Sequence, residues 1–341
     1  MKKFLFKTSL LLLPFFATLL LYLIYVAPNL SGDLGVLGKI PFGKQYDQKM
    51  ATHYLKELWV SNYKQNSNHQ FKIITIGDSF SMQWQKGYQN YLAHLTGDSI
   101  LQFQYRDCFS PEQAALLLLK SGFFQQEKTQ FVIIESVERE FVKRLQKIDF
   151  NLQSDFQDIL DDETIEEVPI SKKRNYLEEY SSWVRLLLDY ENPVKKAKLN
   201  QSFFSIHPQD LYFYIDDLNT AELTKNEIEA AKQNLLKLHQ LFESYHINMI
   251  YMVASDKYDL YRPYIVRNSF PSKEIMQSFE AFDSTCYYLN TQNILRPLLQ
   301  QGIHDVYFAN DSHWSYIASE KVAEKLYEMM QNWGKDGSKQ P

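Results

Sequence analysis

The sequence of 341 residues is poor in the groups that build metal and redox sites, since it contains only two cysteines. No cluster of cysteine and histidine has the spacing of a metal site, and no glycine-rich loop is present to cradle a phosphate. The net charge is −5 and no basic run is interleaved with aromatic residues, which argues against nucleic-acid binding. We therefore expect no metal, no cofactor and no nucleic-acid partner.

The two cysteines, Cys108 and Cys286, allow one internal pairing. A disulfide between them is chemically permitted outside the cytoplasm. Two isolated buried thiols fit the sequence equally well, so both alternatives remain open.

Long apolar runs are also scarce, and residues 8–26 form a single charge-free stretch of 19 residues. A helix of this length crosses about 30 Å of hydrocarbon. Three lysines precede the stretch (Lys2, Lys3 and Lys7), whereas the first charge beyond it is Asp33. By the positive-inside rule, this asymmetry places the short tail in the cytoplasm and the rest of the chain on the periplasmic or extracellular face.

A cleaved signal peptide is the competing interpretation of the same stretch. The apolar core is long for a signal peptide, and Pro28 directly after Ala27 disfavours cleavage there. We expect an uncleaved signal anchor that spans the membrane once.

The chain beyond the anchor is long enough for one large domain with an insertion, or for two domains. Short apolar segments alternate with helical stretches such as 114–120, which predicts an α/β fold, a three-layer sandwich with helices on both faces of a parallel sheet. The expected strands are 71–76, 100–103, 131–134 and 247–253. We expect helices at 46–60 and 315–331, and another that begins at the capping box of Thr224 and Glu227.

The expected organisation has four parts. Residues 1–27 form the tail and anchor, 28–70 a linker and leading helix, 71–332 the α/β domain, and 333–341 a flexible tail. Residues 141–222 break the alternation of strands and helices, and we interpret them as an insertion that covers the active-site edge.

A candidate nucleophile, Ser79, stands in the motif Gly77-Asp78-Ser79-Phe80 directly after the expected strand 71–76. Side chains at the carboxyl edge of a parallel sheet face the ligand site of open α/β folds. The backbone N–H of Ser79 is then available for an oxyanion. The same tripeptide recurs at Gly97-Asp98-Ser99, but no strand precedes that copy, so we interpret it as a loop.

A candidate base, His313, stands two residues after Asp311. A carboxylate this close can orient the imidazole, which then takes the proton of the serine. A purely structural histidine, with Asp311 as a helix N-cap, is the alternative. Capping alone would not require His313, so the pattern predicts a catalytic group of Ser79, His313 and Asp311.

These motifs resemble those of the SGNH hydrolase superfamily. The stretch 307–310 before the histidine and Trp314 after it resemble the branch of alginate O-acetyltransferases and related cell-surface polysaccharide O-acyltransferases. The segment 252–261, a strand followed by Lys257 and Tyr258, is similar to one in that branch. The resemblance implies an SGNH or flavodoxin-like sheet, with Ser79 as nucleophile, His313 as base and Asp311 as its orienting acid.

Two departures accompany the resemblance. In the alginate proteins the Asp-x-His-Trp motif precedes the serine motif, whereas here the serine comes first. The superfamily also takes oxyanion donors from a glycine after its second strand and an asparagine after its third. Here those strands lead into 105–108 and 135–139, which contain neither residue. Ser136 is a possible substitute donor, and Glu135 with Arg139 is expected to form an i,i+4 pair on a helix.

The resemblance implies a membrane-anchored O-acyltransferase that acts outside the cytoplasm on a cell-surface or exported polysaccharide, with acetyl as the expected acyl group. Its partners would be an acyl donor, a carbohydrate acceptor and a membrane-bound protein that delivers acyl groups. A carbohydrate esterase that removes acetyl groups is the alternative. A non-catalytic polysaccharide-binding scaffold on the same fold is the third interpretation.

Overall fold

The structure is a computed structural model that describes residues 2–63, 70–106, 109–153, 159, 176–188, 192–282 and 287–333. Cys108, Cys286 and most of the acidic stretch 155–167 lie outside the described residues, as does the C-terminal tail beyond residue 333. The predictions made for them stay predictions.

The central element is a six-stranded parallel sheet in the order β1-β3-β2-β4-β7-β8. Its strands are Val60–Asn62 (β1), Ile73–Ile76 (β2), Ile100–Gln102 (β3), Phe131–Val137 (β4), Asn248–Ala254 (β7) and Tyr288–Asn290 (β8). The chain passes from β2 to β3 on one side and then to β4 on the other. The strand order therefore reverses at β2, and ligands of open α/β sheets bind at the carboxyl ends of such strands.

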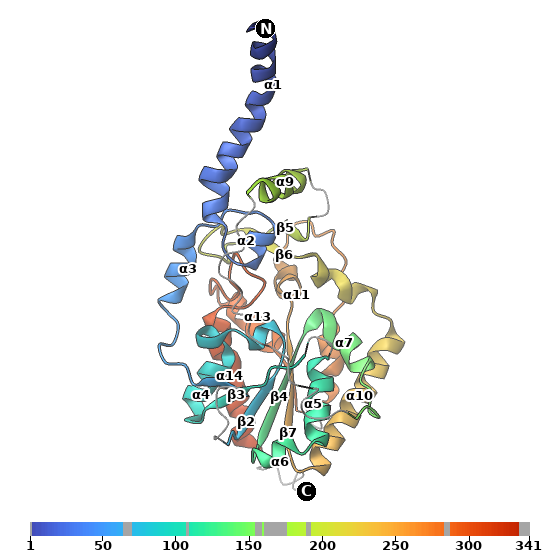
Figure 1. Cartoon of the computed structure of the whole chain (residues 1–341). Helices are drawn as coiled ribbons and strands as arrows, with labels where there is room; N and C mark the ends of the chain where they lie inside the picture. The colour runs from blue at the N-terminus through green and yellow to red at the C-terminus, as the bar shows by residue number, and fades with distance from the viewer. Residues whose placement is uncertain are drawn as a thin grey trace.

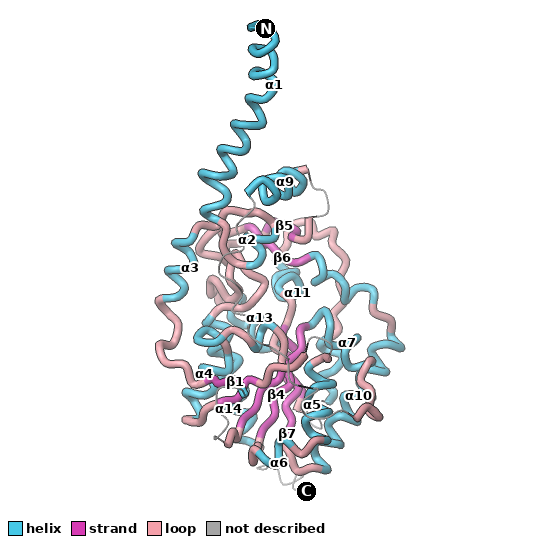
Figure 2. Tube along the Cα trace, viewed as in Figure 1, coloured by secondary structure: helices cyan, strands magenta, loops and turns pink. Residues whose placement is uncertain are grey.

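Helices cover both faces of the sheet (Figures 1 and 2). Alternate strand residues belong to two separate hydrophobic clusters, one on each face. The helices of one face are α4 (Tyr88–Thr96), α13 (Gln292–Gln300) and α14 (Tyr316–Asn332); those of the other are α5 (Pro111–Lys120), α6 (Phe123–Gln126), α7 (Glu138–Gln146) and α10 (Lys225–Ser244). The three-layer α/β sandwich predicted from the sequence is confirmed.

Smaller elements gather beyond the carboxyl ends of the strands (Figure 1). They include an antiparallel pair of strands, β5 (Val194–Lys198) and β6 (Asp210–Tyr214). The helices there are α2 (Asp33–Leu37), α3 (Lys44–Ala51), α9 (Tyr176–Leu187) and α11 (Lys257–Tyr261). Short 3-10 turns complete the described chain at Ser79–Ser81 (η4), Trp84–Lys86 (η5), Ile215–Glu222 (η6), Arg262–Tyr264 (η7) and Met276–Phe282 (η8).

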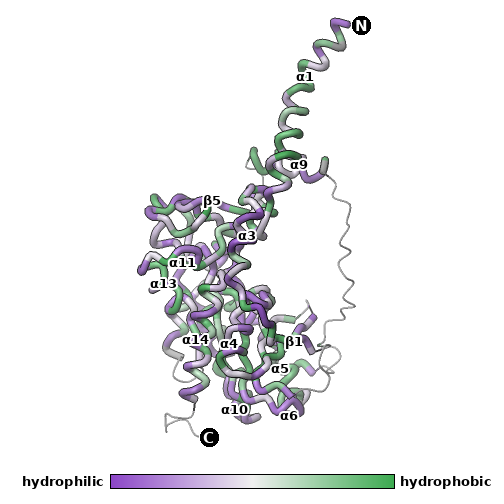
Figure 3. The backbone as a smooth tube through the Cα atoms, turned by 90° about the vertical axis from the view of Figure 1, so that its left-hand side faces the viewer, coloured by the Kyte–Doolittle hydropathy of each residue, from purple (hydrophilic) through white to green (hydrophobic). Residues whose placement is uncertain are grey.

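The N-terminal segment is one apolar helical rod. The helix α1 (Lys2–Leu21) continues through a π-helical turn, Tyr22–Val26 (η1), and a 3-10 turn, Ala27–Asn29 (η2). The rod projects away from the body (Figure 1), and most of it is coloured as hydrophobic in Figure 3. Residues Lys2–Asn29 are long and apolar enough to cross a membrane, a test that a signal sequence would also pass.

Several predicted elements are confirmed. The capping box is present, since Thr224 Oγ1 accepts from the N–H of Glu227 while the Glu227 side chain accepts from the N–H of Thr224. The second Gly-Asp-Ser copy lies in the turn between α4 and β3, where Gly97 ends the helix with a φ of +73°. A left-handed residue at this position is the usual C-terminal stop of a helix.

Other predictions were wrong. The helix expected at 46–60 ends at Ala51, because Val60 pairs with Ile100 and begins the edge strand β1. The expected helical pair of Glu135 and Arg139 does not form, since Glu135 lies within β4, which runs on to Val137. The cap of α14 is Ser315, whose hydroxyl accepts from the N–H of Ile317, so Asp311 is not an N-cap.

Candidate active site

Ser79 lies in the first turn after β2, at the reversal of strand order, and its side chain is exposed to solvent. The turn is held by Asp78, whose carboxylate accepts from the N–H of Phe80 at 3.3 Å and from the N–H of Val137 at 3.0 Å. Two neighbouring strand ends, those of β2 and β4, are thereby tied together. The serine is presented at the sheet edge as the sequence predicted.

Asp78 is also paired with Arg144 of α7, with 2.9 Å between the guanidinium and the carboxylate. Burial would raise the pKa of the Asp78 carboxyl, but the charges of Arg144 and Arg139 and hydrogen bonds to Glu135 and Arg144 outweigh it, and the pKa is lowered. Asp78 is therefore ionised at neutral pH and acts as a fixed acceptor under the serine turn.

Glu135 fills the space behind the same turn. Its Oε2 accepts from the N–H of Asp78 at 3.0 Å and from the hydroxyl of Ser81 at 2.9 Å. Burial, with the charge of Asp78 next, raises the pKa of Glu135 well above its ordinary value. A buried acid beside an ionised Asp78 keeps its proton, which avoids two adjacent negative charges.

Gly77 is required by this close packing and not by an unusual backbone angle. A Cβ at this position would lie 2.2 Å from Ser81 Oγ and 2.5 Å from Glu135 Oε2. Any side chain at residue 77 would therefore displace the two groups that support the serine turn.

His313 reaches the serine from the loop before α14. Its Nε2 lies 2.8 Å from Ser79 Oγ, and its Nδ1 lies 2.5 Å from Asp311 Oδ1. Because the ionised carboxylate can only accept, Nδ1 carries the proton, and Nε2 of the neutral ring accepts from the Ser79 hydroxyl. The structure brings together all three residues that the sequence singled out.

The electrostatics of Asp311 fit this arrangement. Burial would raise the pKa of its carboxyl, but the hydrogen bond and charge of His313, with Lys86 nearby, hold the pKa well below the ordinary value. Asp311 is thus charged across the physiological range. A permanent negative charge at Nδ1 fixes the tautomer and stabilises the imidazolium that forms when Nε2 takes a proton.

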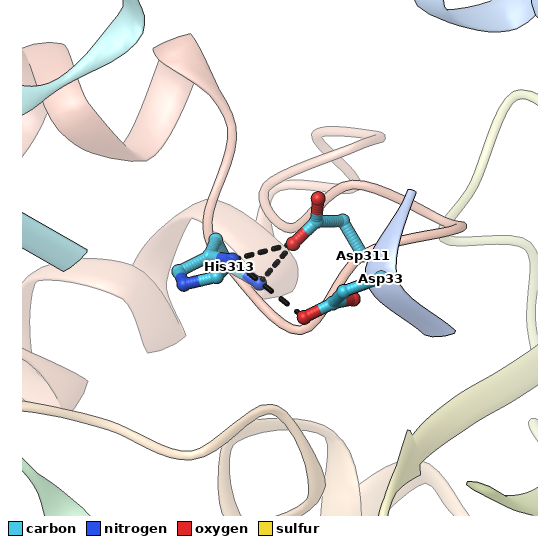
Figure 4. Close-up of side chains that lie close together, drawn as sticks. All are labelled: Asp33, Asp311 and His313. Atoms are coloured by element: carbon cyan, nitrogen blue, oxygen red, sulfur yellow. Dashed lines mark hydrogen bonds and ion pairs between the residues drawn. The ribbon is translucent and has the colours of Figure 1, made fainter. Parts of the chain in front are cut away.

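A second carboxylate, Asp33, lies on the same side of the imidazole as Asp311 (Figure 4). Its Oδ2 is 3.8 Å from His313 Nδ1, and its Oδ1 accepts from the N–H of Ser312 at 2.7 Å. Burial, followed by the charge of Asp311, raises the pKa of the Asp33 carboxyl. The hydrogen bonds to Ser312 lower it but do not cancel the shift. Asp33 thus ties the start of α2 to the loop that carries the histidine.

Further bonds join the segment after the anchor to this loop. The side-chain amide of Asn310 donates to Ser31 Oγ at 2.9 Å and to Asp47 Oδ1 at 2.8 Å. Gly32, with a φ of +69°, lies so close that a Cβ would be 2.1 Å from the Asn310 carbonyl oxygen. Residues 31–35, which the sequence suggested were linker, form one wall of the site.

Lys257 supports the loop that carries Asp311 and His313. Its ammonium group donates to the carbonyl oxygens of Phe308 at 2.7 Å, Ala309 at 3.1 Å and Asp311 at 3.0 Å. Burial lowers the pKa of this amine to about 8, although nearby carboxylates, Asp33 first, oppose the shift. A buried amine with three carbonyl partners acts as a clamp on the loop rather than as a base.

The N–H of Ser79 donates no hydrogen bond to any residue that the structure describes, which leaves it free for an oxyanion. Ser136, considered above as a second donor, is buried and its hydroxyl accepts from Arg144 at 2.8 Å. Glu138, not an asparagine, follows the end of β4. The structure therefore agrees with the sequence that the asparagine donor expected after the third strand of the superfamily is replaced here by Glu138.

Two groups of described residues bring three metal-type ligands together. The first group consists of Asp33, Asp311 and His313. Its imidazole nitrogen, Nδ1 of His313, already forms a hydrogen bond with Asp311. In Glu138, Asp256 and Asp259, Arg139 donates to Asp256 and Gln292 donates to both oxygens of Glu138. Within the described residues, Asp256 Oδ2 and Asp259 Oδ2 are buried without a hydrogen-bond partner.

A comparison with known families agrees with the resemblance seen in the sequence. The model of the SGNH hydrolase-like domain of acetyltransferase AlgX matches residues 209–340. The match includes Asp311 and His313, while Ser79 lies upstream of it. No curated protein and no solved structure matches the chain. Residues 209–340 are therefore similar to the SGNH hydrolase-like domain of acetyltransferase AlgX.

Sequence reasoning missed the supporting residues. Asp33 gave no signal beyond being the first charge after the anchor, and Glu135 was placed on a helix. Lys257 was noted as part of a familiar segment, but its role as a clamp needed the three-dimensional positions of its carbonyl partners.

We expect Gly77→Ala to abolish activity on a small acyl ester and to lower the free energy of unfolding by about 1–3 kcal/mol, because its Cβ overpacks the serine turn. Gly97→Ala, in the second tripeptide, is the matched control. The positive φ of Gly97 makes this substitution costly in stability. No described atom lies within 4 Å of the added Cβ, so activity should remain. Urea unfolding and ester hydrolysis of the detergent-solubilised chain measure both. Wild-type activity in Gly77→Ala would contradict this account of the turn.

We expect Lys257→Met to lower kcat on the same ester by roughly 10- to 100-fold, because a loop displaced by a fraction of an ångström misaligns His313. Each carbonyl left without a donor costs about 1–3 kcal/mol of stability. Lys321→Met is the control, since the ion pair of Lys321 in the described part of the chain is with Glu324 on the exposed face of α14. Equal kcat in the two variants would show that the clamp does not position the histidine.

Proposed function

We propose that this chain is a membrane-anchored O-acyltransferase that works outside the cytoplasm, with acetyl as the expected acyl group and a cell-surface or exported polysaccharide as acceptor. The observation that carries the proposal is the continuous chain of hydrogen bonds from Ser79 through His313 to Asp311. The family match to an acetyltransferase domain and the apolar N-terminal helix support it from separate directions.

The first half of the reaction acylates the enzyme. His313 Nε2 takes the hydroxyl proton of Ser79 as Oγ attacks the carbonyl carbon of the acyl donor. The oxyanion that forms is within reach of the Ser79 N–H. The bond to the leaving group then breaks, the leaving group receives the proton from His313, and an acyl ester remains on Ser79.

The second half transfers the acyl group. A sugar hydroxyl gives its proton to His313 Nε2 and attacks the acyl ester. The bond to Ser79 Oγ breaks, and the proton returns to Ser79. Asp311 stays ionised throughout and stabilises the imidazolium in both halves. Because Ser79 is exposed, a polymer chain can reach it without a deep tunnel.

Water competes with the sugar for the same acyl-enzyme, so a carbohydrate esterase remains the alternative function. Incubation of the full chain with an activated acetyl ester and a series of oligosaccharides separates the two. The transferase predicts acetylated oligosaccharide at the expense of free acetate. Free acetate that is unaffected by every oligosaccharide would favour the esterase. The expected acyl-delivering membrane protein would replace the activated ester in the cell.

We expect Ser79→Ala to reduce turnover of the acetyl ester by 10³-fold or more, since loss of a triad nucleophile leaves only oxyanion and binding contributions. The matched control is Ser99→Ala in the second Gly-Asp-Ser tripeptide, which lies in an exposed turn and should keep wild-type turnover. Initial rates of acetate release measure both. If Ser79→Ala turns over at the rate of Ser99→Ala, the enzymatic proposal fails and the scaffold interpretation takes its place.

A further inference from the structure

The helix α9 (Tyr176–Leu187) packs against the N-terminal rod and not into the two clusters of the α/β core. Tyr180 and Trp183 form a separate cluster with Tyr22, Val26 and Ala27. Figures 1 and 3 both show α9 beside the end of α1 that meets the body. The described partners of this helix in a hydrophobic cluster are therefore the N-terminal rod and Leu30, which directly follows it.

Polar contacts fix the position of α9 along the length of the rod. The hydroxyls of Thr18 and Tyr180 are 2.6 Å apart, and the Tyr22 hydroxyl donates to Glu179 at 3.1 Å. The ring of Tyr180 also meets Phe15 edge-on, with 5.5 Å between centroids. The contact thus extends along about two turns of the rod, from Phe15 in α1 to Tyr22 in η1.

That contact overlaps the segment that would cross the membrane. At 1.5 Å per residue, Thr18 lies about 12 Å and Phe15 about 16 Å from Val26, the end of the apolar stretch. If α9 stayed in water, the lipid would have to end before Phe15. Residues 8–14 would then span only about 10 Å, far short of the roughly 30 Å of hydrocarbon. A rod that spans the membrane therefore brings α9 into contact with lipid.

The sequence of α9 suits this position. At 100° per residue, the apolar side chains of residues 177–188 other than Leu186 fall within an arc of about 140°, and the charged and hydroxyl side chains fall outside it. Leu186 falls on the polar side, between Glu179 and Ser182. Tyr180 and Trp183 occupy the part of the arc that faces the rod, and both are types that favour the membrane–water interface. Val184 also packs against the rod, but three leucines on this arc are exposed, with exposed fractions of 62% for Leu177, 64% for Leu187 and 76% for Leu188, which directly follows α9.

We propose that α9 lies in the outer interface of the lipid bilayer, with its uncovered leucines against acyl chains and its charged face towards the headgroups. The inference rests on the membrane anchoring proposed above. In this arrangement the rod and α9 form a two-helix footing, and charged side chains such as Arg185 extend to the headgroups. Asp33 follows Val26 by seven residues, so the footing holds the histidine loop within about 24 Å of the membrane.

The test uses the full chain with Cys108 and Cys286 changed to serine, reconstituted in phosphatidylcholine and phosphatidylglycerol vesicles that contain lipids with a quencher on the acyl chain. An environment-sensitive fluorophore is attached at Leu187→Cys in α9. Two matched exposed leucines serve as controls, Leu12→Cys in α1 and Leu95→Cys in α4, with exposed fractions of 43% and 41%.

We expect the probes at residues 187 and 12 to be quenched and blue-shifted in vesicles, while the probe at 95 behaves as in water. Quenching at 12 without quenching at 187 would overturn the interfacial position of α9 and leave the anchor intact. If neither is quenched, the anchoring proposal itself fails. Loss of ester turnover in these variants would instead report on the catalytic site, so the failures are distinguishable.

Discussion

The hydrogen bond between Ser79 Oγ and His313 Nε2 is 2.8 Å long and joins two chain segments that are 234 residues apart. It depends on contacts that position the serine on one side and the histidine on the other. The serine side is fixed by sheet geometry, because Asp78 ties the ends of β2 and β4 and Glu135 supports the turn from behind. The histidine side is a loop, which has no such regular support. Its position depends on the Lys257 clamp below and on Asp33 beside it.

The two halves of the site therefore have different origins of rigidity. Buried strands fix the position of Ser79, whereas charged and amide side chains fix the position of His313. The loop that carries His313 is also joined to the segment after the N-terminal rod, since Ser31, Gly32 and Asp33 all contact the loop directly. A segment that looks like a spacer in the sequence is a wall of the site, and the same rod carries α9 at its base. The candidate active site and the proposed membrane footing therefore belong to one continuous part of the structure.

Much of the fold could be predicted because buried parallel strands are apolar runs that end in turn residues. The strands β2, β3, β4 and β7 were predicted by this rule, while the edge strands β1 and β8 were not. The triad was predictable because the sequence places Ser79 at a strand end and Asp311 two residues from His313. Asp33 was not, since its bond to Ser312 spans 279 residues and no local pattern encodes it. Glu135 was misplaced because its spacing from Arg139 imitates a helical pair, although its burial in β4 decides its role.

The central claim is that Ser79 carries the acyl group during turnover. The most direct measurement is peptide-level mass spectrometry of the full chain, quenched in acid within the first turnovers on an activated acetyl ester. The account predicts one added acetyl group on the peptide that contains Ser79, longer-lived in His313→Ala, which lacks the base for deacylation. Ester turnover in which no acetyl group is ever found on Ser79, or in which it is found on another residue, would contradict the account.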